Sequence, residues 1–201
     1  RETEPLSSTV VAELKAGCAT TTSSDQTTAH SRDWWPLSMH WAIAGRTWSI
    51  PGAVCTPTTT HEVIHVVSVC ARHRVPITPM AGRSSVTGAA APAVGGVALD
   101  MTKMNRLLEV DETSGIVCVE PGMFGPELEE TLRKKHRLTV GHFPQSFDIS
   151  TVGGWVASRG AGQYSTRYGK IEDIVIGLEV VLADSRTVRF GPHAAASQGP
   201  E

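Results

Sequence analysis

Several features that would place this 201-residue chain in a common class are missing. No apolar run approaches the ~18 residues of a membrane-spanning helix. Basic and acidic residues are mixed along the chain and nearly balance, to a net charge of -2. The sequence therefore lacks the basic stripe of a nucleic-acid-binding surface. We expect no transmembrane segment and no nucleic-acid partner.

Cysteine is scarce as well. Cys18, Cys55, Cys70 and Cys118 include no C-x-x-C pair, which argues against a zinc knuckle or a small disulfide framework. We interpret them as free thiols of a reducing compartment, so the default location is the cytoplasm. The chain opens on Arg1 without a signal-peptide pattern, and we expect a cut or processed N-terminus.

The N-terminal part has little regular patterning. Residues 1–33 are polar and rich in Ser and Thr, which predicts weak structure. Four tryptophans follow, and we interpret them as packing at a domain interface; they are Trp34, Trp35, Trp41 and Trp48. We therefore divide the chain into a partly irregular segment with a tryptophan-rich end, 1–45, and a regular domain, 46–201.

From residue 51 the patterns become regular. Short strands are predicted over 53–57, 76–80, 96–101 and 107–111, and 115–122 completes a hairpin with the last of these. A second hairpin over 173–190 turns at Ala183–Ser185. Because strands and helices are segregated along the chain, the pattern favours an α+β fold.

Two helices are predicted between these strands. Thr59 and Glu62 form a capping box that starts a helix to about Arg74; its apolar face is Val63, Val66, Val67 and Cys70. Pro126 starts the second helix. There Leu128 and Leu132 are predicted to point inward, and Glu129, Glu130, Arg133 and Lys134 outward.

The first helix carries His61-Glu62-x-x-His65, which matches the zinc-protease pattern. The extended pattern needs a third histidine where this chain has Ala71, and Glu62 already serves as the capping-box acid. We therefore interpret both histidines as surface residues of a helix and expect no bound metal. A zinc metalloprotease stays a remote alternative.

A Gly/Ser-rich loop, Pro-Met-Ala-Gly-Arg-Ser-Ser-Val-Thr-Gly, spans 79–88. Small residues let backbone N–H groups approach and surround a pyrophosphate. The spacing fits neither a Walker loop nor the Rossmann fingerprint. On the residues alone, an ordinary turn is the better interpretation.

A more specific segment covers 141–173. Ser150 and Thr151 are predicted to cap a helix that contains Gly153-Gly154 in its first turn. Each glycine costs a helix ~1 kcal/mol relative to alanine, so the pair indicates that something flat lies close to the backbone. A helix N-terminus with free N–H groups and two hydroxyls suits an anionic or carbonyl-rich ligand. Close helix–strand packing explains the glycines equally well.

The same segment resembles flavoenzymes of the vanillyl-alcohol-oxidase superfamily, which carry a PCMH-type FAD-binding domain. Within it the chain is most similar to alkylglycerone-phosphate (alkyl-dihydroxyacetone-phosphate) synthases. The residues that carry the resemblance are Ser150-Thr151-Val152-Gly153-Gly154-Trp155, Arg159 and Tyr168-Gly169-Lys170-Ile171-Glu172-Asp173, with Gly141-His142, Pro144 and Ser146 upstream. The loop at 79–88 matches more loosely, with Ala81, Arg83 and Ser84 in place of Gly, Gly and Thr.

The resemblance implies a PCMH-type domain of two α+β subdomains with FAD between them, incomplete at its C-terminus. It also implies a separate substrate domain that supplies the catalytic residues, so none is assigned here. The implied FAD-binding residues are Pro79, Met80, Ala81, Gly82, Arg83, Ser84, Ser85, Gln145, Ser146, Phe147, Asp148, Ile149, Ser150, Thr151, Gly153, Gly154, Ser158, Arg159, Gly160 and Ala161.

The family's reaction would be the exchange of acyl for alkyl on dihydroxyacetone phosphate in ether-lipid synthesis. The rival is an FAD-linked 2-hydroxy-acid dehydrogenase or oxidase, because the cofactor site alone does not select the substrate. Either way we expect a FAD-dependent transferase or oxidoreductase whose isolated fragment is inactive. The substrate would be a lipid phosphate or a hydroxy acid, and the location peroxisomal in a eukaryote. Peripheral membrane contact and a homodimer stay open.

Arg83 departs from the pattern in an informative way. Relatives that attach FAD covalently through this loop have a histidine there, and an arginine cannot form that bond. We therefore expect non-covalent FAD. Arg83 either supplies charge to a phosphate or faces solvent.

Overall fold

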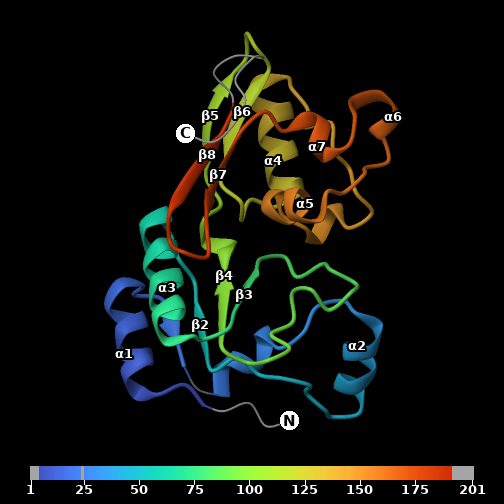
Figure 1. Ribbon diagram of the computed structural model, residues 1–201. Coiled ribbons are helices and arrows are strands. Elements are labelled where there is room, and N and C mark those ends of the chain that lie inside the picture. Colours follow the sequence, from blue (N-terminus) through green and yellow to red (C-terminus); the bar gives the residue numbers. More distant parts are fainter. Residues whose placement is uncertain (1–4, 24, 192–201) are drawn as a thin grey trace. The chain divides into compact units, whose positions relative to one another are not determined.

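The computed structural model describes residues 5–23 and 25–191 (Figure 1). They form two compact units. One comprises the described residues of Arg1–Lys103 together with Val181–Thr187, and the other those of Met104–Val180 and Val188–Glu201. Each unit combines helices with strands, which confirms the α+β prediction. A domain boundary at 45/46 stays a prediction.

The first unit is built on a four-stranded mixed sheet in the order β1-β2-β4-β3. β1 (Thr21–Thr22) pairs antiparallel with β2 (Ala53–Cys55). β4 (Val97–Asp100) runs parallel to both β2 and β3 (Ile77–Met80). The predicted strands of this region are thus confirmed, and the central one, β4, is almost entirely buried because it has neighbours on both sides.

Helix α3 (Thr60–His73) begins at the predicted N-cap residue: the Thr59 hydroxyl accepts a hydrogen bond from the Glu62 N–H at 3.2 Å. The reciprocal half of the predicted capping box differs, because the Glu62 carboxylate accepts from the Thr58 N–H rather than from that of Thr59. Its buried face differs in one position from the prediction. Val69 is buried, and Val67 is half-buried. The buried set still follows helical spacing, with Val69 one turn from Val66 in place of Val67.

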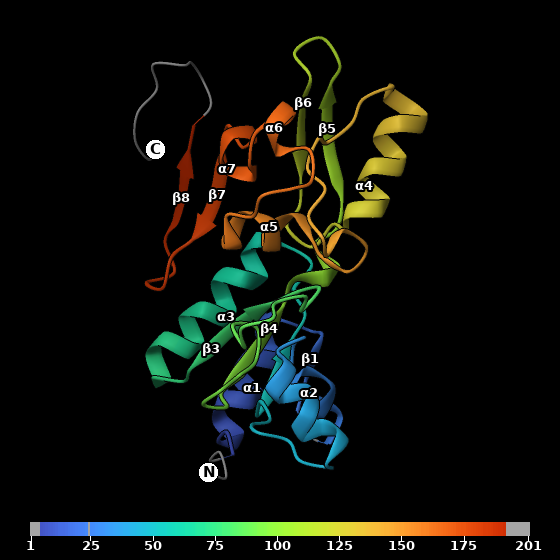
Figure 2. The same ribbon diagram turned by 90° about the vertical axis from the view of Figure 1, so that its right-hand side faces the viewer.

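The prediction of weak structure over residues 1–33 is wrong for α1 (Ser8–Gly17), a helix that buries Val10 and Leu14. It lies beside α3 (Figure 2). A ring nitrogen of His65 on α3, Nε2, is bonded to the Glu13 carbonyl oxygen at 2.8 Å. Helix propensity and composition did not predict α1, because its stability comes from packing against α3.

The first unit also contains the 3-10 helix η1 (Asp25–His30) and the helix α2 (Pro36–Ile43). Pro36 occupies the first helical turn, where its missing N–H costs nothing. Three tryptophans around α2 pack edge-on or tilted against one another, with ring centroids 5.4–5.7 Å apart; they are Trp35, Trp41 and Trp48.

The second unit opens with the predicted hairpin of β5 (Leu107–Asp111) and β6 (Ile116–Val119). α4 (Gly125–Thr131) lies along it and continues into a π-helical turn, η3 (Leu132–His136) (Figure 1). The buried residues Met123, Leu128 and Leu132 pack against valines of the hairpin. The inward prediction for the two leucines is confirmed.

The remaining described elements are short: η2 (Met101–Lys103), η4 (Phe147–Ile149), α5 (Val152–Ser158), α6 (Ser165–Tyr168), α7 (Ile171–Ile174), β7 (Leu178–Val181) and β8 (Thr187–Phe190). β7 and β8 form the predicted second hairpin. Within the described ranges, no helix has the length and apolar character needed to cross a bilayer.

Glu129 on α4 was predicted to point outward, and this is wrong: it is only 7% exposed. Its carboxylate accepts hydrogen bonds from the Thr139 hydroxyl at 2.8 Å and the Val140 N–H at 3.0 Å, and it pairs with Arg133. A buried carboxylate is stable only with such partners. Glu129 therefore fixes the strand-like segment that leads into residues 141 and 142.

Candidate functional site

The zinc-protease pattern lies on α3 as predicted, but its side chains serve the fold. Glu62 accepts hydrogen bonds from the Thr58 N–H (2.5 Å) and hydroxyl (2.8 Å), and chiefly the N–H bond lowers the pKa of the Glu62 carboxyl. His65 is bonded to α1 through the Glu13 carbonyl. Among the residues that the structure describes, no group of three His, Cys, Asp or Glu side chains could hold a metal ion.

The loop after β3 presents unpaired backbone donors. Within the described residues, no acceptor is bonded to the N–H groups of Gly82, Arg83 or Ser84. The loop bends because Arg83 has a φ of 52°, in the left-handed region. The carbonyl of Ser85 accepts a hydrogen bond from the Trp34 N–H at 2.9 Å, which fixes the end of the loop. Consecutive N–H groups at a left-handed bend are the geometry that binds phosphate oxygens.

Two side chains of this loop are already engaged. Met80 is 5% exposed and packs with Val54 and Ala98 in the core of the first unit, so only its backbone can face a ligand. One terminal nitrogen of Arg83, Nη1, donates to the carbonyl of Ala29. A guanidinium carries five N–H donors, so Arg83 keeps most of its capacity for an anion.

The segment before α5 is stabilised by aromatic packing. Phe147 stacks on Trp155, with centroids 5.9 Å apart and planes 15° apart, and the Trp155 indole N–H donates to the Ser150 hydroxyl at 2.6 Å. Ser150 and Thr151 are 2% and 1% exposed. The expectation of two ligand-facing hydroxyls at the start of α5 is therefore wrong for Ser150, whose hydroxyl is buried against Trp155.

The start of α5 also differs from the prediction. Thr151 occupies the N-cap position, but its side chain makes no capping bond. The first two N–H groups are not free, since Val152 donates to the Met123 carbonyl at 2.9 Å and Gly153 to the Pro121 carbonyl at 2.8 Å. The N–H of Gly154 has no acceptor among the described residues.

The adjacent glycines have different surroundings. A Cβ on Gly153 would lie 2.6 Å from the Pro121 Cβ and 2.9 Å from its carbonyl oxygen. A Cβ on Gly154 would meet only the Thr151 hydroxyl at 3.4 Å, and Gly154 is exposed. Close packing therefore explains Gly153, whereas an open face with a free N–H explains Gly154.

The end of α5 is held by charge. Arg159 closes the helix with a φ of 52° and its Nε donates to Glu172 of α7 at 2.5 Å. Arg159 and Lys170 together lower the pKa of Glu172 to about 2. Next to them, the Ser158 hydroxyl donates to the Gly154 carbonyl at 2.9 Å. Arg159 is thus the C-cap residue of α5.

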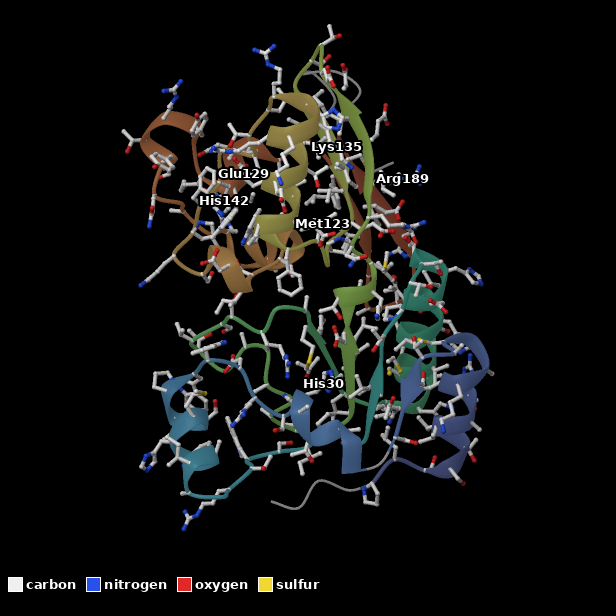
Figure 3. All side chains as sticks on the ribbon, turned by 180° about the vertical axis from the view of Figure 1, so that it is seen from behind. His30, Met123, Glu129, Lys135, His142 and Arg189 are labelled. Atoms are coloured by element: carbon white, nitrogen blue, oxygen red, sulfur yellow. The ribbon has the colours of Figure 1, made fainter. Side chains whose placement is uncertain are left out.

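One residue was missed as a site residue, although it belongs to the motif that carried the resemblance. His142 is fully buried, yet neither ring nitrogen has a hydrogen-bond partner among the described residues (Figure 3). Its ring packs against Trp155 at 5.0 Å, and a Cβ on Gly160 would approach it within 3.8 Å. Burial lowers the pKa of His142.

An unpartnered buried polar group costs about 1–3 kcal/mol, so the ring nitrogens of His142 are candidate contacts for a bound polar group. The unpaired N–H groups after β3 and on Gly154 point the same way. Each unit thus offers donors without side-chain bulk, which is what a large anionic cofactor with a flat ring system requires. Fold and geometry together define the class: a cofactor-binding domain.

Comparison with known proteins identifies the cofactor. A family model described as an FAD binding domain matches residues 51–191. The chain belongs to this family of FAD-dependent enzymes, and FAD is its cofactor.

Alkyldihydroxyacetonephosphate synthase of Dictyostelium discoideum is 36% identical over 140 residues, which cover 68% of this chain and 23% of that protein. Glycolate oxidase subunit GlcD of Bacillus subtilis is 36% identical over 147 residues, covering 73% and 31%. A solved alkyldihydroxyacetonephosphate synthase superposes with a TM-score of 0.87 at 30% identity over 94% of this chain and 35% of the other. The chain thus spans less than a third of the length of these curated relatives.

Proposed function

We propose that this chain is the FAD-binding part of an enzyme similar to alkyldihydroxyacetonephosphate synthase. The observation that carries the proposal is the superposition on a solved synthase over 94% of the chain. The activity proposed for the whole enzyme is the exchange of an acyl for an alkyl group on dihydroxyacetone phosphate, a step of ether-lipid synthesis.

In the proposed site, the N–H groups of residues 82–84 bind the pyrophosphate, and Arg83 adds positive charge to it. The segment 145–161 faces the flavin, with Gly154 at the closest approach. Met80, Ser150 and Gly153 support these contacts through the backbone or through packing, since their positions are buried or close-packed. The remaining residues of the FAD set named from the sequence stay part of the proposal.

FAD supplies the reactive ring system when it is bound. The contribution of this chain is to bind and orient that ring. His142 is neutral near pH 7 because burial lowers its pKa, so it offers one N–H donor and one acceptor nitrogen to a polar group. The stacked Phe147 and Trp155 exclude water from that side of the segment. The catalytic acid–base groups are proposed to lie in a substrate domain outside this sequence.

A second candidate function is an FAD-linked 2-hydroxy-acid dehydrogenase or oxidase. The identity of 36% to the glycolate oxidase subunit, over a longer stretch than the synthase match, supports it. A lipid phosphate is the substrate in the first case and a hydroxy acid in the second. We propose that the enzyme is cytoplasmic, or peroxisomal if the organism is a eukaryote. A homodimer and contact with a membrane surface belong to the same proposal.

The test uses the full-length protein that contains this chain. It is assayed with an acyl-dihydroxyacetone phosphate plus a fatty alcohol, and in parallel with D-lactate and glycolate plus an artificial electron acceptor. Alkyl product from the first assay alone supports the synthase. Turnover of a 2-hydroxy acid alone replaces it with the dehydrogenase. Activity in neither assay from a flavin-loaded protein contradicts both candidates.

A further inference from the structure

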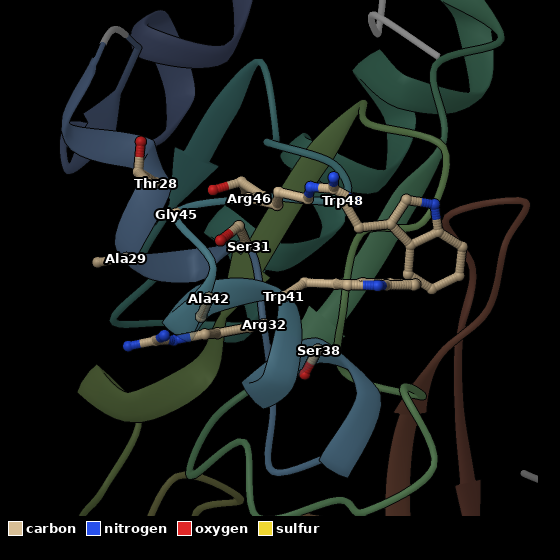
Figure 4. A pocket seen from close by; sticks show the side chains of 11 residues that line it. Thr28, Ala29, Ser31, Arg32, Ser38, Trp41, Ala42, Gly45, Arg46 and Trp48 are labelled. Atoms are coloured by element: carbon tan, nitrogen blue, oxygen red, sulfur yellow. The ribbon is translucent and has the colours of Figure 1, made fainter.

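A pocket of about 290 Å³ lies in the first unit between η1, α2 and the loop that follows α2 (Figure 4). Its lining includes the side chains of Arg32, Arg46, Trp41 and Trp48. None of the lining residues belongs to the loop at 79–85 or to the segment 141–161. The pocket is therefore separate from the residues proposed for FAD.

The sequence builds this pocket with a glycine turn. Gly45, with a φ of 68°, lets the chain reverse after α2, and the Arg46 N–H donates to the Trp41 carbonyl at 2.8 Å. This closes the helix with a glycine in the left-handed conformation. The reversal brings Trp48 back onto Trp41 and Trp35, so the indole rings form a rigid apolar wall.

The charge of the pocket is unbalanced. Among the described side chains, no acidic one lines it, and neither Arg32 nor Arg46 forms an ion pair or hydrogen bond through its side chain there. Asp33 does not compensate, because it is 3% exposed and its two oxygens accept N–H groups of Trp35 and Ala90. Two arginines thus line one pocket without a described acidic residue, and their guanidinium groups lie apart from each other (Figure 4).

We propose that this pocket binds a small organic phosphate with an apolar part. Guanidinium groups match phosphate oxygens in geometry as well as charge, and indole rings cover an apolar group at little entropic cost. The volume equals roughly ten water molecules at ~30 Å³ each, which fits a phosphate ester with a short chain. The site goes beyond the proposed function, because it is a second ligand site in the same unit.

The pocket is linked to the cofactor loop through Ala29. Ala29 lines the pocket, and its carbonyl accepts the hydrogen bond from Arg83. Because of this shared contact, the experiment includes a competition with FAD, which distinguishes a second ligand site from the FAD site.

The full-length protein that contains this chain is titrated with hexyl phosphate, and binding is followed by calorimetry and tryptophan fluorescence. We expect saturable binding, at least ten-fold tighter than that of inorganic phosphate or hexanol. The double variant Arg32→Gln/Arg46→Gln should bind at least ten-fold more weakly with an unchanged circular dichroism spectrum. The matched control is Lys103→Gln, an exposed cation of the same unit outside the pocket, and it should bind like the parent chain.

Several outcomes would overturn the proposal. These are no saturable binding in the millimolar range, equal binding by the double variant, or equal loss in Lys103→Gln. If saturating FAD abolishes the binding of hexyl phosphate, the pocket belongs to the FAD site instead. These results do not depend on which reaction the full-length enzyme catalyses, so failure here leaves the proposed function standing.

Discussion

At the residue scale, the glycines of α5 separate packing from ligand access. Gly153→Val forces a branched side chain against Pro121 and should lower the free energy of unfolding of the FAD-free protein by about 1–3 kcal/mol. The valine side chain of Gly154→Val would point into open space, so the free energy of unfolding of the FAD-free protein should not change. In the full-length protein it should weaken FAD binding at least ten-fold, which corresponds to about 1.4 kcal/mol.

Thermal unfolding without FAD and FAD titration by flavin fluorescence measure the two effects. Equal loss of FAD-free stability in both variants would mean that Gly154 is also a packing residue. Retention of full FAD affinity by Gly154→Val would remove this helix face from the cofactor site.

His142 gives a pH dependence with a definite sign. Burial lowers its pKa below the ordinary value of 6.5, so on acidification the unfolded chain takes up a proton before the folded chain does. The contribution to stability is therefore constant above about pH 6.5. It is lost as the pH falls below that value, at up to about 1.4 kcal/mol per pH unit, until the folded pKa is reached.

The measurement is denaturant unfolding of FAD-free protein at a series of pH values between 5 and 8, the range in which histidine charge changes. The free energy of unfolding of His142→Phe should change less with pH below pH 6.5 than that of the parent protein, because the ring that gains the proton on unfolding is gone. His61→Asn, at the exposed start of α3, is the matched control and should keep the parent profile. A parent profile that does not fall on acidification, or one that is identical in His142→Phe, would contradict this account.

At the element scale, α4 holds the chain that leads to His142. Glu129 is buried and accepts hydrogen bonds from Thr139 and Val140, whereas its neighbour Glu130 is exposed and pairs with Lys134. Glu129→Ala leaves two donors without an acceptor and should lower the free energy of unfolding by about 2–4 kcal/mol. Glu130→Ala should have no measurable effect, because an exposed ion pair contributes little.

Urea unfolding of the two variants checks this pair directly. Because Glu129 fixes residues 139 and 140, the Glu129→Ala protein should also bind FAD less tightly under conditions where it is still folded. Equal stability of the two variants would show that the buried contacts of Glu129 are not maintained in solution.

At the scale of the whole molecule, we predict that FAD is held without a covalent bond. Arg83 occupies the loop position at which a histidine would be needed for attachment, and its side chain is bonded to Ala29. The purified full-length protein should show oxidised-flavin absorbance. Acid precipitation should leave all of that flavin in the supernatant, as read by its absorbance there. Flavin that stays with the precipitated polypeptide would show that the bond forms through another residue.

The sequence by itself determined most strands, the helices α3 and α4 and the family to which the chain belongs. Strand alternation, the N-cap at Thr59, the proline at the start of α4 and the turn before β8 are local signals, and each specifies backbone geometry over a few residues. The cofactor followed from the residues at 141–173 because a motif preserves the chemistry of a site even when its geometry is unknown.

Only the tertiary structure decided which of these residues are available to a ligand. Gly153 and Gly154 are adjacent and identical in sequence, yet Pro121, thirty-odd positions earlier, fills the space beside the first and leaves the second open. Glu129 and Glu130 differ in the same way, and so do the buried hydroxyl of Ser150 and the unpartnered ring of His142. Availability depends on which distant segment packs against a residue, and helical or strand periodicity carries no information about that contact.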